Sequence, residues 1–259
     1  MRSLDGVGVL VTRPQTQAMP LCRLLEEHGA TTIQLPAIVI EPVAAQRELA
    51  ARLGPLDDAD LVIFTSANAV RFGAALLGQR RNLILAAIGP ATKRALNQAG
   101  YRVAIVPGGG FDSAHLLAEP RLQHLAGRRV VLVKGVGGRE LLAEELAERG
   151  AIVRAVEVYR RLPATPGAER LRRIEQRLAA GELQIVTATS LEIGAALLSL
   201  AGAGLRAQFE RLHWLVAGAR IATGLAHLGV AAPIIEAASA EDQDLLEALL
   251  RWRATLSGA

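Results

Sequence analysis

Polar side chains that could take part in chemistry follow several apolar runs of the chain, each where the run ends. Three such segments are Thr12–Arg13, Thr65–Asn68 and the glycine-rich segment 134–139. If the runs are parallel strands, their carboxyl ends meet at the edge of the sheet where ligands bind. Hydroxyls, backbone N–H groups and cations at that edge suit an anionic small molecule.

The segment 134–139 (Lys-Gly-Val-Gly-Gly-Arg) is the strongest of these local signals. Gly135, Gly137 and Gly138 allow the backbone to approach a ligand closely, and the helix expected after them offers free N–H groups. Lys134 and Arg139 bracket the glycines with positive charge. By itself the segment is equally compatible with a flexible tight turn.

Two further segments open predicted helices. Ser66 and Asn68 place a hydroxyl and an amide at a helix start, where either is also explained as an N-cap contributing about 1 kcal/mol. Gly89, Thr92 and Lys93 open the next helix. A cation in the first turn opposes the helix dipole, so stability explains Lys93 less well than Thr92. We treat all five as candidate ligand contacts.

Tyr159 is one of only two tyrosines in the chain and lies in an extended segment, Val156–Pro163. Because this segment falls outside the predicted core strands, we expect the Tyr159 hydroxyl to face a cleft. The alternative is that the ring packs one face of an amphipathic strand.

Short apolar runs alternate with longer helical patterns that end at glycine. We expect strands at 7–11, 31–35, 61–64, 83–88, 103–106 and 130–133. A regular succession of strand, short turn, helix and glycine is typical of right-handed βαβ units around a buried parallel sheet. The sequence therefore predicts an α/β fold with doubly wound parallel sheets.

An internal repeat relates the two halves of the chain. Three short matches, at offsets of 121, 124 and 129 residues, relate residues 6–126 to residues 127–250. The alternative is the general likeness of all βα units, but an ordered series with a slowly drifting offset favours duplication. Leu35–Pro42 and Val156–Pro163 hold matching places, and both are extended and closed by proline. We expect them to pair as a two-stranded connector between two domains.

Composition narrows the class of protein. The 259 residues are 51% apolar, and 29 Lys and Arg against 25 Asp and Glu give a net charge of +4. This length and apolar content favour two domains with separate cores. The basic residues are scattered among acidic ones instead of forming a nucleic-acid-binding stripe. No apolar run approaches the roughly 20 residues of a membrane span, and no leader pattern is recognised, so we expect a cytoplasmic protein.

No cofactor or metal is expected. The single cysteine, Cys22, excludes an intramolecular disulfide framework and a cysteine-based zinc site. The five histidines lack the spacing of metal ligands, and they are best explained as solvated or capping residues. The chain has no Gly-x-Gly-x-x-Gly after a strand, no phosphate-loop lysine motif and no Gly-x-Ser-x-Gly.

Taken together, five segments resemble the uroporphyrinogen-III synthase family over nearly the whole chain. They are Val11–Pro14, Phe64–Val70, Ile88–Thr92, Lys134–Leu142 and Glu157–Arg161. Each is short, and the resemblance rests on their order, spacing and joint presence. It implies two similar α/β domains joined by a two-stranded ladder. Domain 1 would comprise residues 1–36 and 164–259, and domain 2 residues 40–158.

The resemblance also implies a reaction. The linear tetrapyrrole hydroxymethylbilane is cyclised to uroporphyrinogen III, with inversion of ring D and loss of water, by a lyase that uses no cofactor or metal. The eight carboxylates of the substrate suit glycine loops, helix N-termini and basic side chains. The family's cleft tyrosine matches Tyr159, which becomes the candidate acid, a mild one given the ordinary tyrosine pKa of about 10.

We expect substrate contacts at Thr12, Arg13, Ser66, Asn68, Gly89, Thr92, Lys93, Lys134, Gly135, Gly137, Gly138, Arg139 and Ser190. The sequence departs from the family where Lys134 replaces a frequent arginine, which keeps the charge but loses the bidentate fork. In the second repeat, Gly218–Ile221 lacks a counterpart of Thr92, and the apolar and acidic pair Leu191-Glu192 follows Ser190.

We further expect a monomer with mobile domains that receives its substrate from hydroxymethylbilane synthase. The rival hypothesis is a two-domain module that binds a small anion and catalyses nothing, as in periplasmic or repressor-type binding proteins. The sequence shows neither an export signal nor a DNA-binding headpiece, which favours the enzyme.

Overall fold

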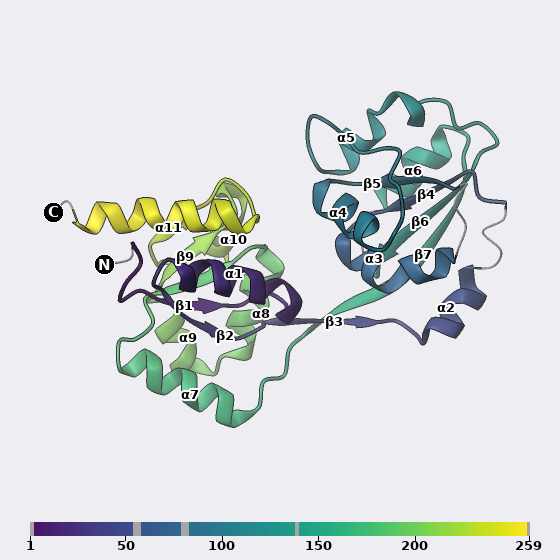
Figure 1. Ribbon diagram of the computed structural model, residues 1–259. Coiled ribbons are helices and arrows are strands. Elements are labelled where there is room, and N and C mark those ends of the chain that lie inside the picture. Colours follow the sequence, from purple (N-terminus) through teal and green to yellow (C-terminus); the bar gives the residue numbers. More distant parts are fainter. Residues whose placement is uncertain (1–2, 54–57, 79–82, 138–139, 258–259) are drawn as a thin grey trace. The chain divides into compact units, whose positions relative to one another are not determined.

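A computed structural model describes residues 3–53, 58–78, 83–137 and 140–257 (Figure 1). The chain divides into two compact units: unit 1 is Met1–Val39 with Leu162–Ala259, and unit 2 is Ile40–Arg161. The chain passes between the units twice, within β3 (Ile38–Pro42) and within β7 (Ile152–Pro163). These two strands are neighbours in one sheet, so the expected two-stranded connector is confirmed.

Unit 1 has a five-stranded sheet in the order β10-β9-β8-β1-β2. Its strands are β1 (Gly8–Val11), β2 (Thr31–Gln34), β8 (Ile185–Ala188), β9 (His213–Val216) and β10 (Ile234–Glu236). Its helices are α1 (Gln15–Glu27), α7 (Ala168–Ala179), α8 (Leu191–Leu200), α9 (Ala203–Phe209), α10 (Ala219–His227) and α11 (Asp242–Ser257). The pairs of neighbouring strands are parallel throughout this sheet, as the sequence predicts.

Unit 2 has a second five-stranded sheet in the order β3-β7-β6-β4-β5. Its remaining strands are β4 (Leu61–Phe64), β5 (Ile84–Ala87) and β6 (Arg129–Gly135). Its helices are α2 (Gln46–Leu53), α3 (Ala67–Gly73), α4 (Pro90–Gln98), α5 (Ser113–Leu117) and α6 (Leu141–Glu148), with short 3₁₀ turns η1 (Ala74–Leu77) and η2 (Pro120–Leu122). The pairs β4–β5, β4–β6 and β6–β7 are parallel.

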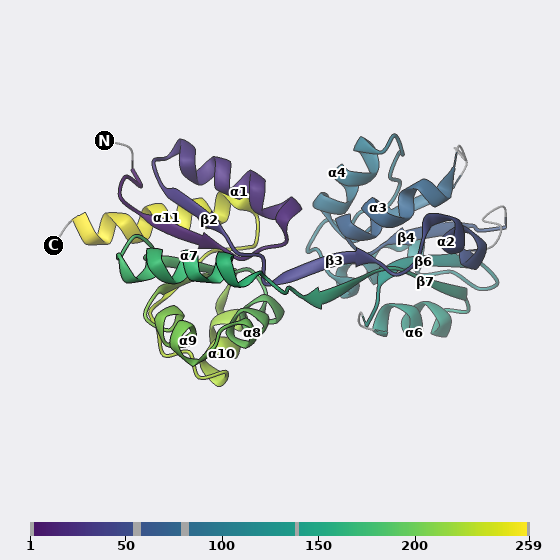
Figure 2. The same ribbon diagram turned by 90° about the horizontal axis from the view of Figure 1, so that it is seen from below.

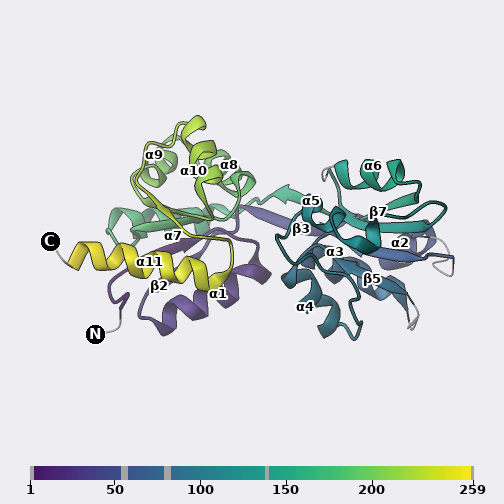
Figure 3. The same ribbon diagram turned by 90° about the horizontal axis from the view of Figure 1, so that it is seen from above.

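Both faces of each sheet are buried, because alternate residues of every central strand point to opposite faces. In unit 1, Val9 and Val11 pack against α1 and α11, whereas Leu10 belongs to the core under α7–α10. Figure 2 shows α1 and α11 on one side of this sheet and α8–α10 on the other. In unit 2, Val62 and Phe64 pack under α2–α4, and the opposite face packs against α5 and α6 (Figure 3).

The sheets show that the sequence repeat is also a structural one. β1 and β6 are second and third from one end of their sheets, each flanked by the strand that follows its helix, β2 and β7 respectively. The equivalent strands start 121 residues apart for β1 and β6, 124 for β8 and β4, and 129 for β9 and β5. Each unit thus joins the first βαβ element of one repeat to the later strands of the other.

Two sequence predictions about strands were wrong. Residues 103–106 form only a single bridge, Ile105 to Ala86, because the N–H groups of Ala104 and Ile105 both donate to the carbonyl of Leu85. The expected turn after residue 133 begins later, because β6 continues through Lys134 and Gly135. Both residues therefore occupy strand positions.

Gly8 offers a test of the packing between β1 and β8. An added Cβ would lie 1.7 Å from the carbonyl oxygen of Glu182, a backbone atom that cannot move without breaking strand pairing. We expect Gly8→Ala to lower the free energy of unfolding of unit 1 by at least about 3 kcal/mol. Both tryptophans, Trp214 and Trp252, belong to unit 1, so urea titration followed by tryptophan fluorescence reports it.

The matched control is Gly204→Ala in α9. An added Cβ there meets nothing within 4 Å, and the exposed helical position should gain roughly 0.5–1 kcal/mol from the replacement of glycine. A parent-like unfolding midpoint for Gly8→Ala would contradict the close approach of β1 to Glu182.

Candidate functional site

A pocket of about 190 Å³ lies at the carboxyl ends of the unit 2 strands. We call it the Tyr159 pocket. Its walls come from the segments that follow β4 and β5, from the end of β6 and from β7. The lining residues are Thr65, Ser66, Ile88, Ser113, Leu132, Lys134, Gly135, Leu142, Tyr159 and Arg161. This is the edge at which open α/β sheets bind their ligands.

Tyr159 presents its hydroxyl to this pocket from an otherwise buried ring. The residue is only 2% exposed, and its ring stacks on Phe72 with 6.1 Å between centroids. The phenolic oxygen lies 3.1 Å from Ser66 Oγ and 3.1 Å from Arg161 Nη2. Ser66 Oγ also accepts the Ala69 N–H at 2.9 Å, so it caps α3 as well. The Tyr159 ring therefore packs in the core while its hydroxyl faces the pocket, so both interpretations offered by the sequence hold for this residue.

A register shift between β6 and β7 places the Tyr159 ring. Lys134 pairs with Glu157, but Gly135 pairs with Tyr159, so Val158 is an extra residue. The shift lets Val158 and Tyr159 both be buried although they are adjacent in sequence. A Cβ on Gly135 would lie 2.6 Å from Cζ of Tyr159, so only glycine leaves room for the ring at this point.

Lys134 brings a cation to the same pocket. Its side chain is 10% exposed, and its Nζ lies 4.0 Å from Oε1 of Glu157, whose side chain is 44% exposed. Across the described ranges, Lys134 forms no hydrogen bond, so the ammonium has unused donors. A buried cation with unused donors suits a carboxylate ligand.

The pocket is also bordered by the first residue of α5, Ser113. Asp112 caps this helix by accepting the His115 N–H at 2.9 Å. That hydrogen bond, followed by the one from the His115 ring, holds the pKa of the Asp112 carboxyl below its ordinary value. The Asp112 carboxylate therefore stays ionised, and its hydrogen bonds cap α5.

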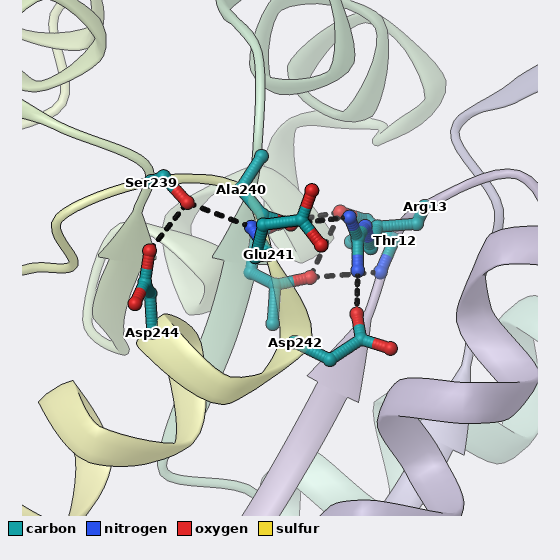
Figure 4. A network of polar contacts seen from close by, with 8 residues as sticks. Thr12, Arg13, Ser239, Ala240, Glu241, Asp242 and Asp244 are labelled. Carbon is teal, nitrogen blue, oxygen red and sulfur yellow. Dashed lines mark hydrogen bonds and ion pairs between the residues drawn. The ribbon is translucent and has the colours of Figure 1, made fainter. Parts of the chain in front are cut away.

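Unit 1 has a polar cluster at the corresponding edge of its sheet, drawn in Figure 4. Thr12 is fully buried and joins β1 to β8: its N–H donates to Thr187 Oγ1 at 3.1 Å, and its hydroxyl donates to the Thr187 carbonyl. These bonds link the carboxyl ends of two neighbouring strands. Thr12 is thus engaged within the fold of unit 1.

Arg13 is tied to the start of α11 (Figure 4). Its Nη1 lies 2.5 Å from Oδ1 of Asp242, and its Nη2 donates to the Ala240 carbonyl at 2.6 Å. Its Nε is buried and has no hydrogen-bond partner within the part of the chain that the structure describes. Most of the donors of this guanidinium therefore stabilise unit 1.

Neither a metal centre nor a membrane segment is found in the described part of the chain. No three of its His, Cys, Asp and Glu side chains are grouped so as to hold a metal ion. None of its helices has the length and apolarity needed to cross a membrane. Cys22 is buried, and this burial raises the pKa of its thiol.

Comparison with known proteins identifies the family. The family model described as uroporphyrinogen-III synthase HemD matches residues 20–247. The chain belongs to the uroporphyrinogen-III synthase family. It is 33% identical over 216 residues to the uroporphyrinogen-III synthase of Escherichia coli (strain K12), covering 81% of this chain and 84% of that one. It is 36% identical over 218 residues to the enzyme of Salmonella typhimurium (strain LT2), with the same coverage of both chains.

Solved structures of the family share the fold. A mutant uroporphyrinogen III synthase from the extremely thermophilic bacterium Thermus thermophilus aligns with a TM-score of 0.60 and 26% identity, over 98% of this chain and all of that one. The Helicobacter pylori 26695 enzyme aligns with a TM-score of 0.61 at 16% identity, over 95% of this chain and 99% of that one, a likeness of fold. This family member is therefore a lyase of porphyrin and heme biosynthesis, and a non-catalytic binding module is not favoured.

The structure brings four of the predicted site residues together. Ser66, Lys134, Gly135 and Tyr159 all line the Tyr159 pocket. The other predicted residues that the structure describes lie elsewhere at the carboxyl edges of the sheets. Gly89 caps α4, Thr92 is buried in its first turn, Lys93 is exposed beside it, Asn68 is half-buried in the first turn of α3, and Gly137 is exposed after β6. Ser190 caps α8 by accepting the Ile193 N–H at 3.2 Å. Gly138 and Arg139 lie outside the described residues.

Sequence reasoning missed two residues that act on Tyr159. Arg161 was not selected because paired arginines occur throughout the chain, and only the strand period, which puts residues 159 and 161 on one face, could have indicated it. Phe72, which stacks on the ring, lies on α3 and carries no sequence signal of that contact. Asp242 was likewise missed, 229 residues from Arg13.

Arg13 offers a test of whether its charge serves the fold. We expect Arg13→Met to lower the free energy of unfolding of unit 1 by about 1.5–3 kcal/mol, the range for hydrogen bonds to charged groups. Arg173→Met is the matched control in unit 1, because Arg173 is exposed and its contact with Glu169 is long, 3.7 Å. It should change stability by less than about 0.5 kcal/mol. Both are measured by urea titration with tryptophan fluorescence. Parent-like stability of Arg13→Met would contradict the structural role.

Proposed function

We propose that the Tyr159 pocket receives the hydroxymethyl-bearing end of hydroxymethylbilane, and that Tyr159 is the acid for loss of its hydroxyl. The observation that carries this proposal is the Tyr159 hydroxyl, held at 3.1 Å from both Ser66 and Arg161 at the edge of a pocket that also contains Lys134. The reaction is that of the family, and we propose that its first step takes place at these residues.

Lys134 is the proposed anchor for a substrate carboxylate. Each pyrrole of the substrate carries two carboxylates, so any ring that enters the pocket brings negative charge with it. The Lys134 ammonium is nine-tenths buried and retains donors that no hydrogen bond uses in the described part of the chain. A carboxylate would therefore gain a charge-assisted hydrogen bond and screen the cation at the same time.

The proposed step is a proton transfer coupled to cleavage of a C–O bond. The Tyr159 O–H gives its proton to the hydroxymethyl oxygen, the electron pair of the C–O bond goes to that oxygen, and water leaves. The pyrrole nitrogen supplies electrons to the carbon, giving an azafulvene-type cation, and Tyr159 is left as phenolate. Because ring D is inverted in the product, this carbon bonds to the α-carbon of ring D that carries the bridge to ring C, that bridge bond breaks, and the bridge re-forms at the free α-carbon of ring D. The free α-carbon loses its proton, which restores the phenol, so the net change is the loss of one water.

Pocket size limits how much of the substrate it holds. A volume of about 190 Å³ is below the roughly 300–1,000 Å³ of sites that enclose a drug-sized ligand. One substituted ring fits this space better than four do. We assign further carboxylates to the other predicted contacts of unit 2, namely Asn68, Gly89, Thr92, Lys93, Gly137, Gly138 and Arg139. Orientation of ring D is then a matter of geometry instead of proton transfer.

The repeat supports placing the acid in unit 2. Pro14 occupies the position 121 residues before Gly135, and Ile38 the position 121 residues before Tyr159. In unit 1 the position equivalent to Tyr159 thus carries no hydroxyl, and the position equivalent to Gly135 has no glycine to make room for a tyrosine ring. Its cation, Arg13, is paired with Asp242.

Finer expectations complete the proposal. We propose that residues 1–36 with 164–259 and residues 40–158 act as the two functional domains, and that the protein is a cytoplasmic monomer that works without a metal or cofactor. Transfer of substrate from hydroxymethylbilane synthase fits the instability of a compound that loses its hydroxyl readily.

Tyr159→Phe tests the acid, because it removes one hydroxyl and keeps the ring. A positioned general acid contributes typically about 10²–10⁴-fold, and for this easily lost group we expect a rate loss at or below about 100-fold. The product should remain the type III isomer. Single-turnover kinetics with fresh hydroxymethylbilane, followed by oxidation and chromatography of the isomers, measures both.

Tyr101→Phe is the matched control, since the only other tyrosine donates to the Gly78 carbonyl at 2.8 Å on the surface of unit 2. It should turn over like the parent. A parent-like rate for Tyr159→Phe would remove this residue from the mechanism, and a shift to the type I isomer would mean that it holds ring D instead.

Lys134→Met tests the anchor. We expect the KM for hydroxymethylbilane to rise by roughly 10- to 100-fold, the effect of losing a hydrogen bond between charged groups. Stability should change by less than about 1 kcal/mol, because the contact with Glu157 is long and half-exposed. Steady-state kinetics and urea titration followed by circular dichroism measure these quantities. An unchanged KM would place the substrate carboxylates elsewhere.

A further inference from the structure

Arg161 controls where the hydrogen of the Tyr159 hydroxyl can point. Its Nη2 lies 3.1 Å from the phenolic oxygen, and its guanidinium carbon lies 5.4 Å from the centre of the Tyr159 ring. A guanidinium can only donate hydrogen bonds. The phenolic oxygen must therefore accept from Arg161, and its own hydrogen is directed away from this side chain.

Ser66 is the second hydrogen-bond partner of the phenolic oxygen. Ser66 Oγ lies 3.1 Å from the phenolic oxygen and already accepts the Ala69 N–H at 2.9 Å. Unlike the guanidinium, a serine hydroxyl can accept a further hydrogen bond. The hydrogen bond between Ser66 and Tyr159 can run in either direction, and in both cases the phenolic hydrogen lies away from Arg161, either toward Ser66 Oγ or toward the pocket.

Contacts other than those of Arg161 also position the ring. Gly135 leaves the space that it occupies, the register shift between β6 and β7 sets its height along the strand, and Phe72 stacks on it. Loss of Arg161 would leave these contacts intact. What the arginine adds is the direction of the proton and a positive charge beside the oxygen that becomes negative when the proton leaves.

We propose that Arg161 is a positioning residue for the acid: it accounts for the orientation of the Tyr159 proton and stabilises the phenolate that remains. The inference rests on the proposed role of Tyr159. It adds a residue that is argued to act through its hydrogen bond to the phenol and not by giving a proton to the substrate. Its effect should therefore appear in kcat and depend on the presence of the Tyr159 hydroxyl.

The test is a double-mutant cycle between Arg161→Met and Tyr159→Phe. Methionine keeps an unbranched stem and removes the donors. We expect Arg161→Met to lower kcat by about 5- to 10-fold with KM changed less than twofold, as for loss of one hydrogen bond in the transition state. Added to Tyr159→Phe, it should have no further effect. Arg161→Lys, which restores a charged donor, should recover part of the loss.

Arg160→Met is the matched control. Arg160 is the neighbouring residue of β7, similarly exposed, and its contact is Glu41 at 3.7 Å instead of the phenol. It should leave kcat at the parent value. If Tyr159→Phe slows the reaction but Arg161→Met does not, or if the two effects multiply, the role of Arg161 is wrong and that of Tyr159 stands. If Tyr159→Phe reacts like the parent, the proposed acid itself fails.

Discussion

The arrangement of the candidate site depends on one close approach, between the β6 backbone at Gly135 and the ring of Tyr159. A Cβ at position 135 would lie 2.6 Å from the ring, so the ring occupies space that any other residue would fill. Because the ring is held there, its hydroxyl reaches Ser66 and Arg161 and faces the pocket that contains Lys134. The register shift in β7 is the backbone adjustment that makes this approach compatible with a continuous sheet.

In the two repeats, one equivalent position carries a cation that stabilises the fold in unit 1 and a cation that is available to a ligand in unit 2. Arg13 and Lys134 hold equivalent positions at the carboxyl ends of β1 and β6, 121 residues apart. In unit 1 the guanidinium pairs with Asp242 and the Ala240 carbonyl, and it joins β1 to α11. In unit 2, within the described residues, the ammonium makes one long contact, with the exposed Glu157. The bidentate fork of arginine suits a structural pair, and the point charge of lysine suits a ligand that must come and go.

The candidate site offers a weak acid, the Tyr159 phenol, and a weak acid is enough for the reaction of the family. A leaving group that departs readily requires a directed proton and control of the cation that follows, more than a strong acid. The ring of Tyr159 is buried in the core of unit 2, and this packing positions its hydroxyl at the pocket. The fold supplies this order through packing, since Val158 and Phe72 belong to the core around the strands and Gly135 leaves space for the ring.

The sequence alone determined the fold class, the repeat and the residue types of the site, because alternating apolar runs and helix-ending glycines depend on local physics. The offsets of 121, 124 and 129 residues match the equivalent strands of the two sheets. Only the tertiary structure decided which polar residues meet. The partner of Arg13 lies 229 residues away, and Tyr159 is placed by a register shift and by Phe72 on α3. Such contacts arise from packing between distant segments, so neither residue type nor spacing along the chain encodes them.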